Sequence, residues 1–191
     1  MGSDLTVLQA LLPNGTLTCD LSDMSDAVAV LPLVFAWRSS EVPFLGPAHT
    51  VMAPGGDLDA VYEGIHTAEP GRVLVIATGG CDRAVWGETT TRRALHRGVA
   101  GVIIDGACRD VNAVRALGLS VIGRGVSPKR AERTAQGKVG ETLRLHGVTI
   151  HPGDLVVNDG NGTAVVPNAQ VKHVVETVSS TNQEVDRETG R

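Results

Sequence analysis

The chain has 191 residues, of which 42% are hydrophobic and 20% are charged, enough for one well-buried core and too few for two comfortable domains. Its 17 basic and 21 acidic residues are spread along the chain, and only 3% of residues are aromatic, which disfavours a nucleic-acid surface of basic patches and stacking platforms. We therefore predict a single domain over residues 1–191, with an N-terminal extension to about residue 20 and a C-terminal helix and tail over residues 168–191.

The sequence also bears on the cellular compartment. No apolar stretch reaches the length of a membrane span, and residues 1–15 lack the basic start and long apolar run of a signal peptide. The three cysteines are far apart and odd in number, which fits a reducing compartment better than a disulfide framework. The sequence predicts a cytoplasmic protein that binds neither membranes nor nucleic acid.

The first elements are read from capping residues and apolar spacing. Residues 22–34, "SDMSDAVAVLPLV", are predicted to form a helix, because Ser22 or Ser25 can accept from the amides of its first turn. "FLGPAHTVMAPGGD" (44–57) is an antiparallel-looking stretch punctuated by Gly and Pro. "LDAVYEGIHTAEPG" (58–71) has helical spacing, and "RVLVIATGG" (72–80) is an apolar run of strand length.

The centre of the chain alternates helices and strands. "GETTTRRALHRG" (87–98) and "DVNAVRALG" (110–118) are predicted helices, while "VAGVIIDG" (99–106) and "LSVIGRGVS" (119–127) are predicted strands. This order predicts parallel strands joined by right-handed crossovers. "TLRLHGVTIHPGDLVVNDGNGTAVVP" (142–167) reads as short strands with hairpin turns, and a final helix follows Pro167. The prediction is an α/β fold with central strand–helix units and added β-hairpins.

Two strand ends in this pattern are rich in polar residues and should lie close together, since ligands bind beyond the carboxyl ends of parallel strands. In the first, residues 79–88, a glycine-containing loop leads into a helix. The free amides at this helix start form an anion site for a carboxylate or phosphate; they belong to Gly87, Glu88, Thr89 and Thr90. An ordinary capped turn is the alternative, and the loop is neither a P-loop nor a GxGxxG fingerprint.

The second strand end, "DGACRD" (105–110), carries Asp105, Cys108, Arg109 and Asp110. Arginine can hold a planar carboxylate bidentately, and aspartate can hold magnesium together with waters and substrate oxygens. Together the Arg–Asp pair suits a small oxoacid chelated to a metal. The alternative is that the two residues pair with their neighbours. Cys108 has no histidine near it in sequence and is assigned a packing role.

Histidines and turn aspartates elsewhere in the chain are interpreted as structural. His146 and His151 flank a predicted hairpin strand and form no HxxxH pair. Asp154 and Asp159 lie in turn sequences, where aspartate commonly bonds to its own backbone.

Several of these segments resemble a known family. "GPAHTV", "PGRVLVIATGGCDRAVWGE", "GVAGVIIDGACRD", "GVSP" and "HGVTIHPGDLVVNDGNGTAVVP" are similar to the family that joins the regulator of ribonuclease activity A with the pyruvate-forming 4-hydroxy-4-methyl-2-oxoglutarate aldolases. The resemblance runs from Ser22 to Glu176. It implies a swivelling β/β/α domain assembled as a homotrimer or homohexamer, with sites between subunits.

The resemblance also implies site residues and a cofactor. The backbone of residues 87–90 would bind the oxoacid carboxylate, Arg109 would contact substrate, and Asp110 would hold Mg²⁺ or Mn²⁺. Glu88, and Glu184 from an adjoining subunit, would hold waters on that metal. The reaction implied is cleavage of a 4-hydroxy-2-oxoacid to pyruvate, with decarboxylation of oxaloacetate as a side activity. The two loops contain no lysine, which argues against a Schiff base.

One departure from the family pattern keeps a second interpretation open. Enzymes of the family commonly carry an acid three residues after the Asp of "RD", where this chain has Ala113. The alternative is a non-catalytic oligomeric regulator that binds a ribonuclease or another protein. The Arg109–Asp110 pair, which such regulators often lack, favours the enzyme. A methyltransferase has less support, since the nucleotide-binding glycine pattern is missing.

Overall fold

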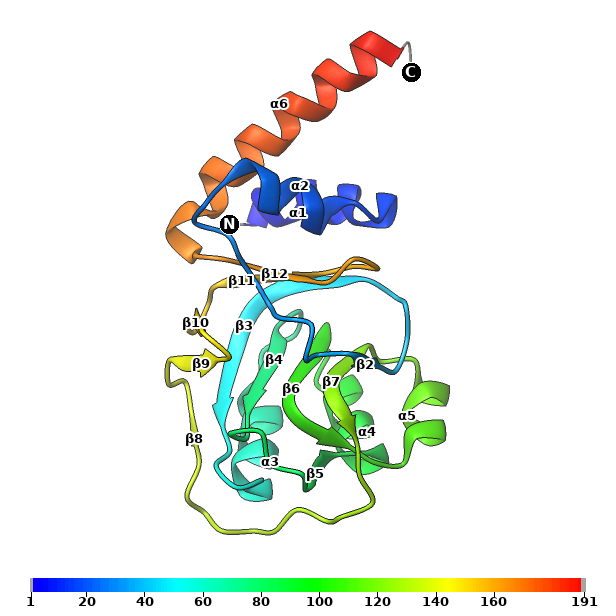
Figure 1. Cartoon of the computed structure of the whole chain (residues 1–191), viewed down its shortest axis with the longest axis vertical. Helices are drawn as coiled ribbons and strands as arrows, with labels where there is room; N and C mark the ends of the chain where they lie inside the picture. Colours follow the sequence, from blue (N-terminus) through cyan, green and yellow to red (C-terminus); the bar gives the residue numbers. More distant parts are fainter. Residues whose placement is uncertain (1, 190–191) are drawn as a thin grey trace.

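The computed structural model describes the backbone of residues 2–189 and the side chains of residues 5–180. Its main feature is a mixed sheet with the strand order β1-β12-β11-β3-β4-β6-β7-β2, to which β5 and β8 are added beside β6 and β3 (Figure 1). The strands of this sheet are β1 (Ala29–Val30), β2 (Trp37–Arg38), β3 (Phe44–Met52), β4 (Val73–Ala77), β5 (Ala84–Trp86), β6 (Gly101–Cys108), β7 (Val121–Val126), β8 (Lys138–Val139), β11 (Leu155–Asn158) and β12 (Thr163–Val166).

The predicted parallel units are confirmed in the centre of the sheet. Strands β3, β4, β6 and β7 are parallel neighbours. The helices between them are α3 (Leu58–Thr67), α4 (Glu88–His96) and α5 (Val111–Leu117), and they lie together on one face of the sheet (Figure 1). The helix α5 ends as expected at Gly118, which has a φ of 79°.

Alternation along the strands builds two cores from one sheet. In β4, Leu74 and Ile76 join the cluster under α3, α4 and α5, whereas Val73 and Val75 join the cluster on the other face. That other face is covered by the hairpin of β9 (Leu143–Leu145) and β10 (Val148–Ile150). A strand buried on both faces reads as a continuous apolar run, as "VLVI" does.

The hairpins predicted in the last third are also confirmed. Strands β9 and β10 pair antiparallel, as do β11 and β12. The two-residue turn between β9 and β10 has positive φ at both His146 (47°) and Gly147 (93°), the geometry of a tight hairpin turn that matches strand twist.

The helix predicted over residues 22–34 is wrong. The structure instead has α1 (Gly2–Leu11), a 3₁₀ turn η1 (Leu12–Asn14) and α2 (Leu17–Met24). Ser25 ends α2, and its hydroxyl accepts from the Ala27 amide in a turn at 3.2 Å. The decisive contact is distant in sequence: the backbone N–H and hydroxyl of Thr18 both donate to the Asp159 carboxylate. The expected N-terminal extension is thus tied to the β11–β12 hairpin.

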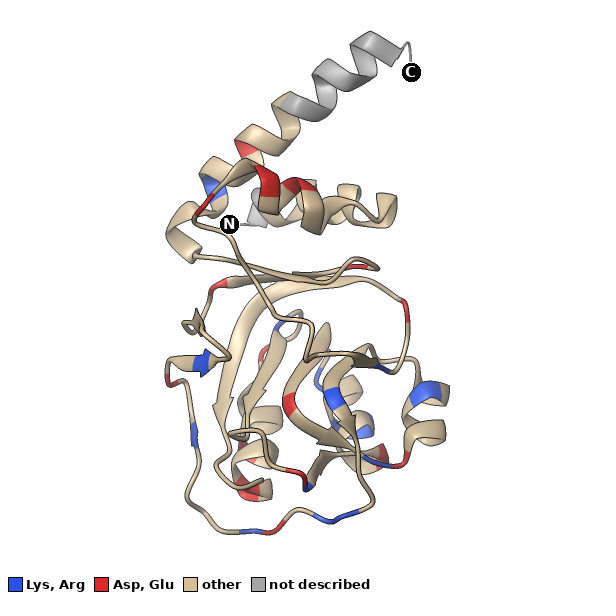
Figure 2. Cartoon of the chain, viewed as in Figure 1, with Lys and Arg blue, Asp and Glu red and all other residues tan. Residues whose placement is uncertain are grey.

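The C-terminal helix follows Pro167 as predicted. A 3₁₀ turn, η2 (Asn168–Gln170), leads into α6 (Val171–Thr189). Valines of α6 pack with leucines of η1 and α2 on β11 and β12, so the terminal helices form a third layer (Figure 1). Within the described part of the chain, no helix is both long and apolar enough to cross a bilayer. Acidic and basic residues are interspersed over the elements (Figure 2).

Candidate active site

The first predicted strand end is organised around Gly87, where β5 passes into α4. The Gly87 N–H donates to the Thr90 hydroxyl at 2.8 Å, and the Gly87 carbonyl accepts from the hydroxyls of Thr90 and Thr91. Buried Trp86 adds an indole N–H bond to the Thr91 hydroxyl at 2.8 Å. These bonds fix the start of α4 and provide the Gly87 amide with an acceptor. In the described part of the chain, the amide of Thr89 has no acceptor.

The second predicted strand end begins after Cys108, because β6 continues further than the apolar run suggested. The Arg109 N–H donates to the Trp86 carbonyl at 2.9 Å, which joins the two loops. Asp110 has a left-handed backbone, with a φ of 52°, and its carboxylate does not cap its own helix α5. Instead, Oδ2 accepts from the Glu88 amide at 3.2 Å and Oδ1 lies 3.4 Å from Arg109 Nε. Both contacts are long, so the carboxylate keeps lone pairs available for another ligand.

Gly87 makes this arrangement possible by lacking a side chain. A Cβ at this position would lie 2.6 Å from Asp110 Oδ2 and 3.0 Å from Arg109 Cγ. The Gly87 backbone is extended, with a φ of −173°, so close approach and not backbone strain requires the glycine. The three residues form one compact unit across two loops.

This unit lines a cavity of about 220 Å³, called the site cavity below. Five of the predicted site residues line it: Gly87, Thr89, Thr90, Arg109 and Asp110. Sequence reasoning missed three polar or aromatic neighbours in the same cavity: Tyr62, Trp86 and Arg130. Trp86 lay within the quoted loop and could have been considered, whereas nothing local in the sequence pointed to Tyr62 on α3 or to Arg130 after β7.

Glu88 and Ala113, two other positions singled out in the sequence, do not line the site cavity. The Glu88 carboxylate accepts from Arg92 Nε at 2.9 Å, one turn along α4, and Glu88 does not line the site cavity. Glu184 falls in the part of α6 whose side chains lie outside the described residues. Ala113 is half-buried on α5 and brings no carboxylate toward Asp110.

The sequence placed Asp105 at the end of its strand, and the structure shows that this placement is wrong. It lies inside β6, is 5% exposed, and is 2.9 Å from Nε2 of His146 and 3.6 Å from Nη1 of Arg124. This contact anchors the β9–β10 turn to the sheet, in agreement with the structural role predicted for His146. Asp154 is likewise structural, since it accepts from the amides of His151 and Asn168.

Cys108 has the packing role that the sequence predicted. Its side chain is buried, and burial raises the pKa of the thiol to about 12, with the nearby Asp110 charge adding to the rise. The thiol is therefore neutral at physiological pH and unsuited to nucleophilic attack.

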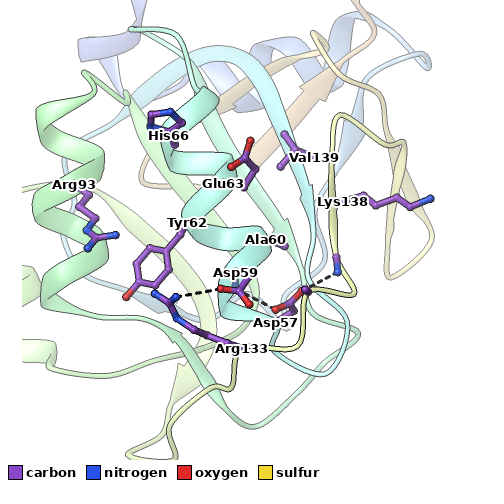
Figure 3. Close-up of a pocket in the computed structure, with 12 residues that line it drawn as sticks. Asp57, Asp59, Ala60, Tyr62, Glu63, His66, Arg93, Arg133, Lys138 and Val139 are labelled. Atoms are coloured by element: carbon purple, nitrogen blue, oxygen red, sulfur yellow. Dashed lines mark hydrogen bonds and ion pairs between the residues drawn. The ribbon is translucent and has the colours of Figure 1, made fainter.

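A second, larger cavity of about 590 Å³ adjoins the site cavity, and Tyr62 lines both. Figure 3 shows the Tyr62 ring between two arginine side chains, Arg93 of α4 and Arg133 of the segment after β7. Their guanidinium carbons lie 4.4 and 5.1 Å from the ring centroid, and Arg133 Nη1 is 3.5 Å from the Asp59 carboxylate. This neighbouring cavity carries charges of both signs.

The donors at the site suit one kind of metal. In the part of the chain whose side chains are described, no three His, Cys, Asp or Glu residues form a ready metal cluster. Among the described side chains, that of Asp110 alone offers a carboxylate to the site cavity. Magnesium is commonly bound by one or two protein carboxylates, with waters and substrate oxygens completing its octahedral coordination. A single carboxylate such as that of Asp110 is sufficient for this mode of binding.

Comparisons with known proteins point to one family. The family model described as RraA-like, Aldolase/RraA, matches residues 18–165. A 4-hydroxy-4-methyl-2-oxoglutarate aldolase from Thermus thermophilus is 30% identical over 151 residues, covering 78% of this chain and 92% of that protein. A Halalkalibacterium halodurans protein, provisionally named for the same activity, is 36% identical over 160 residues, with coverages of 83% and 76%.

A solved structure agrees with the sequence matches. The RNA-processing inhibitor RraA of Thermus thermophilus superposes with a TM-score of 0.73 at 30% identity, and the match covers 78% of this chain and 92% of that one. The mixed α/β architecture with its large mixed sheet is therefore shared with that protein.

Proposed function

The chain belongs to the RraA-like family, Aldolase/RraA, and from that membership we propose that it is a divalent-metal-dependent lyase that cleaves a 4-hydroxy-2-oxoacid and releases pyruvate. Relatives named as aldolases support this activity. The proposal includes decarboxylation of oxaloacetate, because loss of carbon dioxide and retro-aldol cleavage both leave the enolate of pyruvate.

The observation that carries the proposal is the placement of Asp110. A non-glycine residue with positive φ is uncommon and costs free energy unless its surroundings hold it. Here that conformation turns the carboxylate away from α5 and toward Gly87 and the start of α4. A carboxylate, the Arg109 guanidinium and the positive end of a helix dipole then face one small cavity. What distinguishes Asp110 from the positive-φ residue His146 of the β9–β10 turn is that its carboxylate is brought to the same cavity as Arg109 and the start of α4.

Each group has a role in the proposed reaction. The Thr89 amide and the start of α4 bind the substrate carboxylate. Arg109 lies beside the substrate oxygens and opposes the negative charge that develops on the keto oxygen as the carbon–carbon bond breaks. Asp110 would hold Mg²⁺ or Mn²⁺ together with waters and substrate oxygens. When bound, the metal supplies Lewis-acid stabilisation of that same charge.

The proposal also includes self-association as a homotrimer or homohexamer. The side chain of Leu33 is 96% exposed, and Val126 is 55% exposed. Val34 and Val126 line the same surface groove, since the antiparallel pairing of β2 with β7 brings the segment before β2 beside the end of β7. An apolar patch of this kind commonly marks a protein–protein interface.

The direct test is a pyruvate-release assay with a panel of 4-hydroxy-2-oxoacids and oxaloacetate, with and without Mg²⁺ or Mn²⁺. We expect turnover that is abolished by a chelator and restored by either metal. Full activity after exhaustive metal removal would contradict the metal-dependent mechanism.

The second candidate is a protein-binding regulator, which the match to an RNA-processing inhibitor favours. The same assay separates the two candidates. A folded, oligomeric protein that turns over no oxoacid with either metal would reject the lyase and favour the regulator.

A further inference from the structure

Arg130 reaches the site cavity from the segment that follows β7. Its backbone is fixed beside β5, the strand that leads directly into Gly87. Ala84 and Arg130 form a parallel bridge, the Ala84 N–H donates to the Lys129 carbonyl at 2.8 Å, and Arg83 Nη1 donates to the Arg130 carbonyl at 3.1 Å. The position of Arg130 at the cavity is thus set by the fold and not by a free loop.

The other charged residues around this segment have partners of opposite charge. Lys129 Nζ lies 2.9 Å from the Asp82 carboxylate, and Arg83 Nη1 lies 2.6 Å from the Glu132 carboxylate. Arg133 is engaged with Asp59 and Tyr62 in the neighbouring cavity, as described above (Figure 3). The guanidinium of Arg130 has neither a carboxylate partner nor a hydrogen-bond acceptor among the residues whose side chains are described.

The charges that line the site cavity do not balance. Among the described residues that line it there are two guanidinium groups, Arg109 and Arg130, and one carboxylate, Asp110. The positive end of the α4 dipole adds to the excess of positive charge. The proposed reaction uses the start of α4 and Arg109 for the 2-oxoacid end of the substrate. Arg130 is left without a role in binding a monocarboxylate.

The substrate named for the relatives, 4-hydroxy-4-methyl-2-oxoglutarate, carries two carboxylates. We propose that Arg130 is the specificity-determining residue that binds the distal carboxylate of such a substrate, and that it makes this chain prefer dicarboxylic over monocarboxylic 2-oxoacids. Guanidinium groups bind carboxylates in fixed, bidentate geometry, which suits a selective contact. This inference rests on the proposed function only for the placement of the 2-oxoacid end at α4 and Arg109.

Other cations nearby are less suitable for this contact. Arg93 and Lys138 line the neighbouring cavity and not the site cavity, and Arg93 is stacked on Tyr62. Arg130 is also exposed, and its guanidinium has no polar partner among the described side chains, so its replacement should leave the protein folded.

The test uses two non-cleavable five-carbon probes that differ only at the far end, 2-oxoglutarate and 2-oxopentanoate. Their affinities are measured by calorimetry in the presence of Mg²⁺ for the full chain and for Arg130→Ala, Arg130→Lys and Lys129→Ala. We expect the native chain to prefer 2-oxoglutarate. Arg130→Ala should weaken 2-oxoglutarate binding by roughly tenfold to a hundredfold and change 2-oxopentanoate binding by less than about twofold.

The control variants sharpen the outcome. Lys129→Ala removes a neighbouring cation that is paired with Asp82 and does not line the site cavity, so it should leave both affinities unchanged. Arg130→Lys retains the positive charge but loses the bidentate geometry of the guanidinium, so it should bind 2-oxoglutarate with intermediate affinity. It also provides the measurement if Arg130→Ala fails to fold.

Failure of this inference can be distinguished from failure of the proposed function. Equal weakening of both probes in Arg130→Ala, no weakening of either, or no preference in the native chain would overturn the role of Arg130, even if pyruvate release were intact. An Arg130-dependent preference for 2-oxoglutarate in a chain that releases no pyruvate would uphold this inference and reject the lyase.

Discussion

At the scale of single residues, the proposed chemistry depends on one carboxylate, that of Asp110. We predict that Asp110→Asn lowers metal-dependent pyruvate release about a hundredfold or more, since it removes the ionised ligand and weakens charge stabilisation at the keto oxygen. Asparagine tolerates positive φ, and Asp110 is 40% exposed with two long contacts, so the thermal midpoint should change by only a few degrees. The matched control is Asp82→Asn, an exposed carboxylate outside the site cavity. If both variants retain full turnover, Asp110 is not a metal ligand.

Gly87 provides a test of geometry without removal of any functional group. In Gly87→Ala the new methyl group must displace the Asp110 carboxylate or the Arg109 side chain, given the 2.6 and 3.0 Å approaches. We predict a loss of turnover of at least tenfold, because small misplacements of positioned groups are costly in catalysis. Gly160→Ala is the control, as a Cβ added at Gly160 would meet no atom within 4 Å. Native kinetics in Gly87→Ala would show that the close packing of the two loops is not needed.

The residues of the site differ in how far sequence could locate them. Arg109 and Asp110 follow an apolar strand, and Gly87 ends the loop that follows another, so the rule that parallel strands end at one edge was sufficient to bring them together. The short strand β5 between that loop and Gly87 was not predicted. Tyr62 and Arg130 reach the cavity through packing between segments far apart in the chain, and no local spacing encodes that contact. The sequence also could not decide whether the Glu88 side chain points to the site or pairs along its own helix, because a basic residue, Arg92, stands one turn later.

At the scale of elements, the start of α3 is tied to a distant loop by Asp57. The buried Asp57 carboxylate accepts from four backbone amides, those of Asp59, Thr134, Gln136 and Gly137. Burial by itself raises the pKa of Asp57, but these four hydrogen bonds outweigh it and hold the pKa below its usual value of 3.8. The segment that carries Arg130 and Arg133 is thereby fastened to α3.

We predict that Asp57→Asn lowers the free energy of unfolding at pH 7 by about 1–3 kcal/mol, because an amide cannot accept as the carboxylate does. A depressed pKa contributes stability above the pKa of the unfolded state, near 4, and that stability is lost as pH falls through the folded-state pKa. The difference between the native chain and the variant should therefore be full at pH 7 and shrink below about pH 4. Urea unfolding at several pH values measures it, with Asp59→Asn, a partly exposed carboxylate on the same helix, as the control. A difference that grows toward acid would contradict this assignment.

The elements themselves show where sequence patterns suffice. The central strands and helices were predicted because each carries its own period and its own glycine or capping residue, as α5 does with Gly118. The helix expected over residues 22–34 failed because Ser25 satisfies a cap and a turn equally well. The helix forms over residues 17–24 instead, because Leu17 and Leu21 are buried against α6 and Thr18 bonds to Asp159. Neither contact can be read from the local sequence.

At the scale of the whole molecule, the apolar patch at Leu33, Val34 and Val126 is the basis for a test of assembly. We predict that Leu33→Asp dissociates the proposed oligomer, because a buried, unpaired charge at an interface is costly. The monomer should stay folded, since Leu33 is 96% exposed. Light scattering with size-exclusion chromatography measures the mass. Val42→Asp is the matched control: Val42 is 60% exposed but lies at the opposite end of β7, where its carbonyl accepts from the Ser120 hydroxyl. If the native chain is monomeric and active, neither the proposed interface nor a role for it in activity holds. If Leu33→Asp, but not Val42→Asp, loses both the oligomer and turnover, a second copy of the chain completes the site cavity.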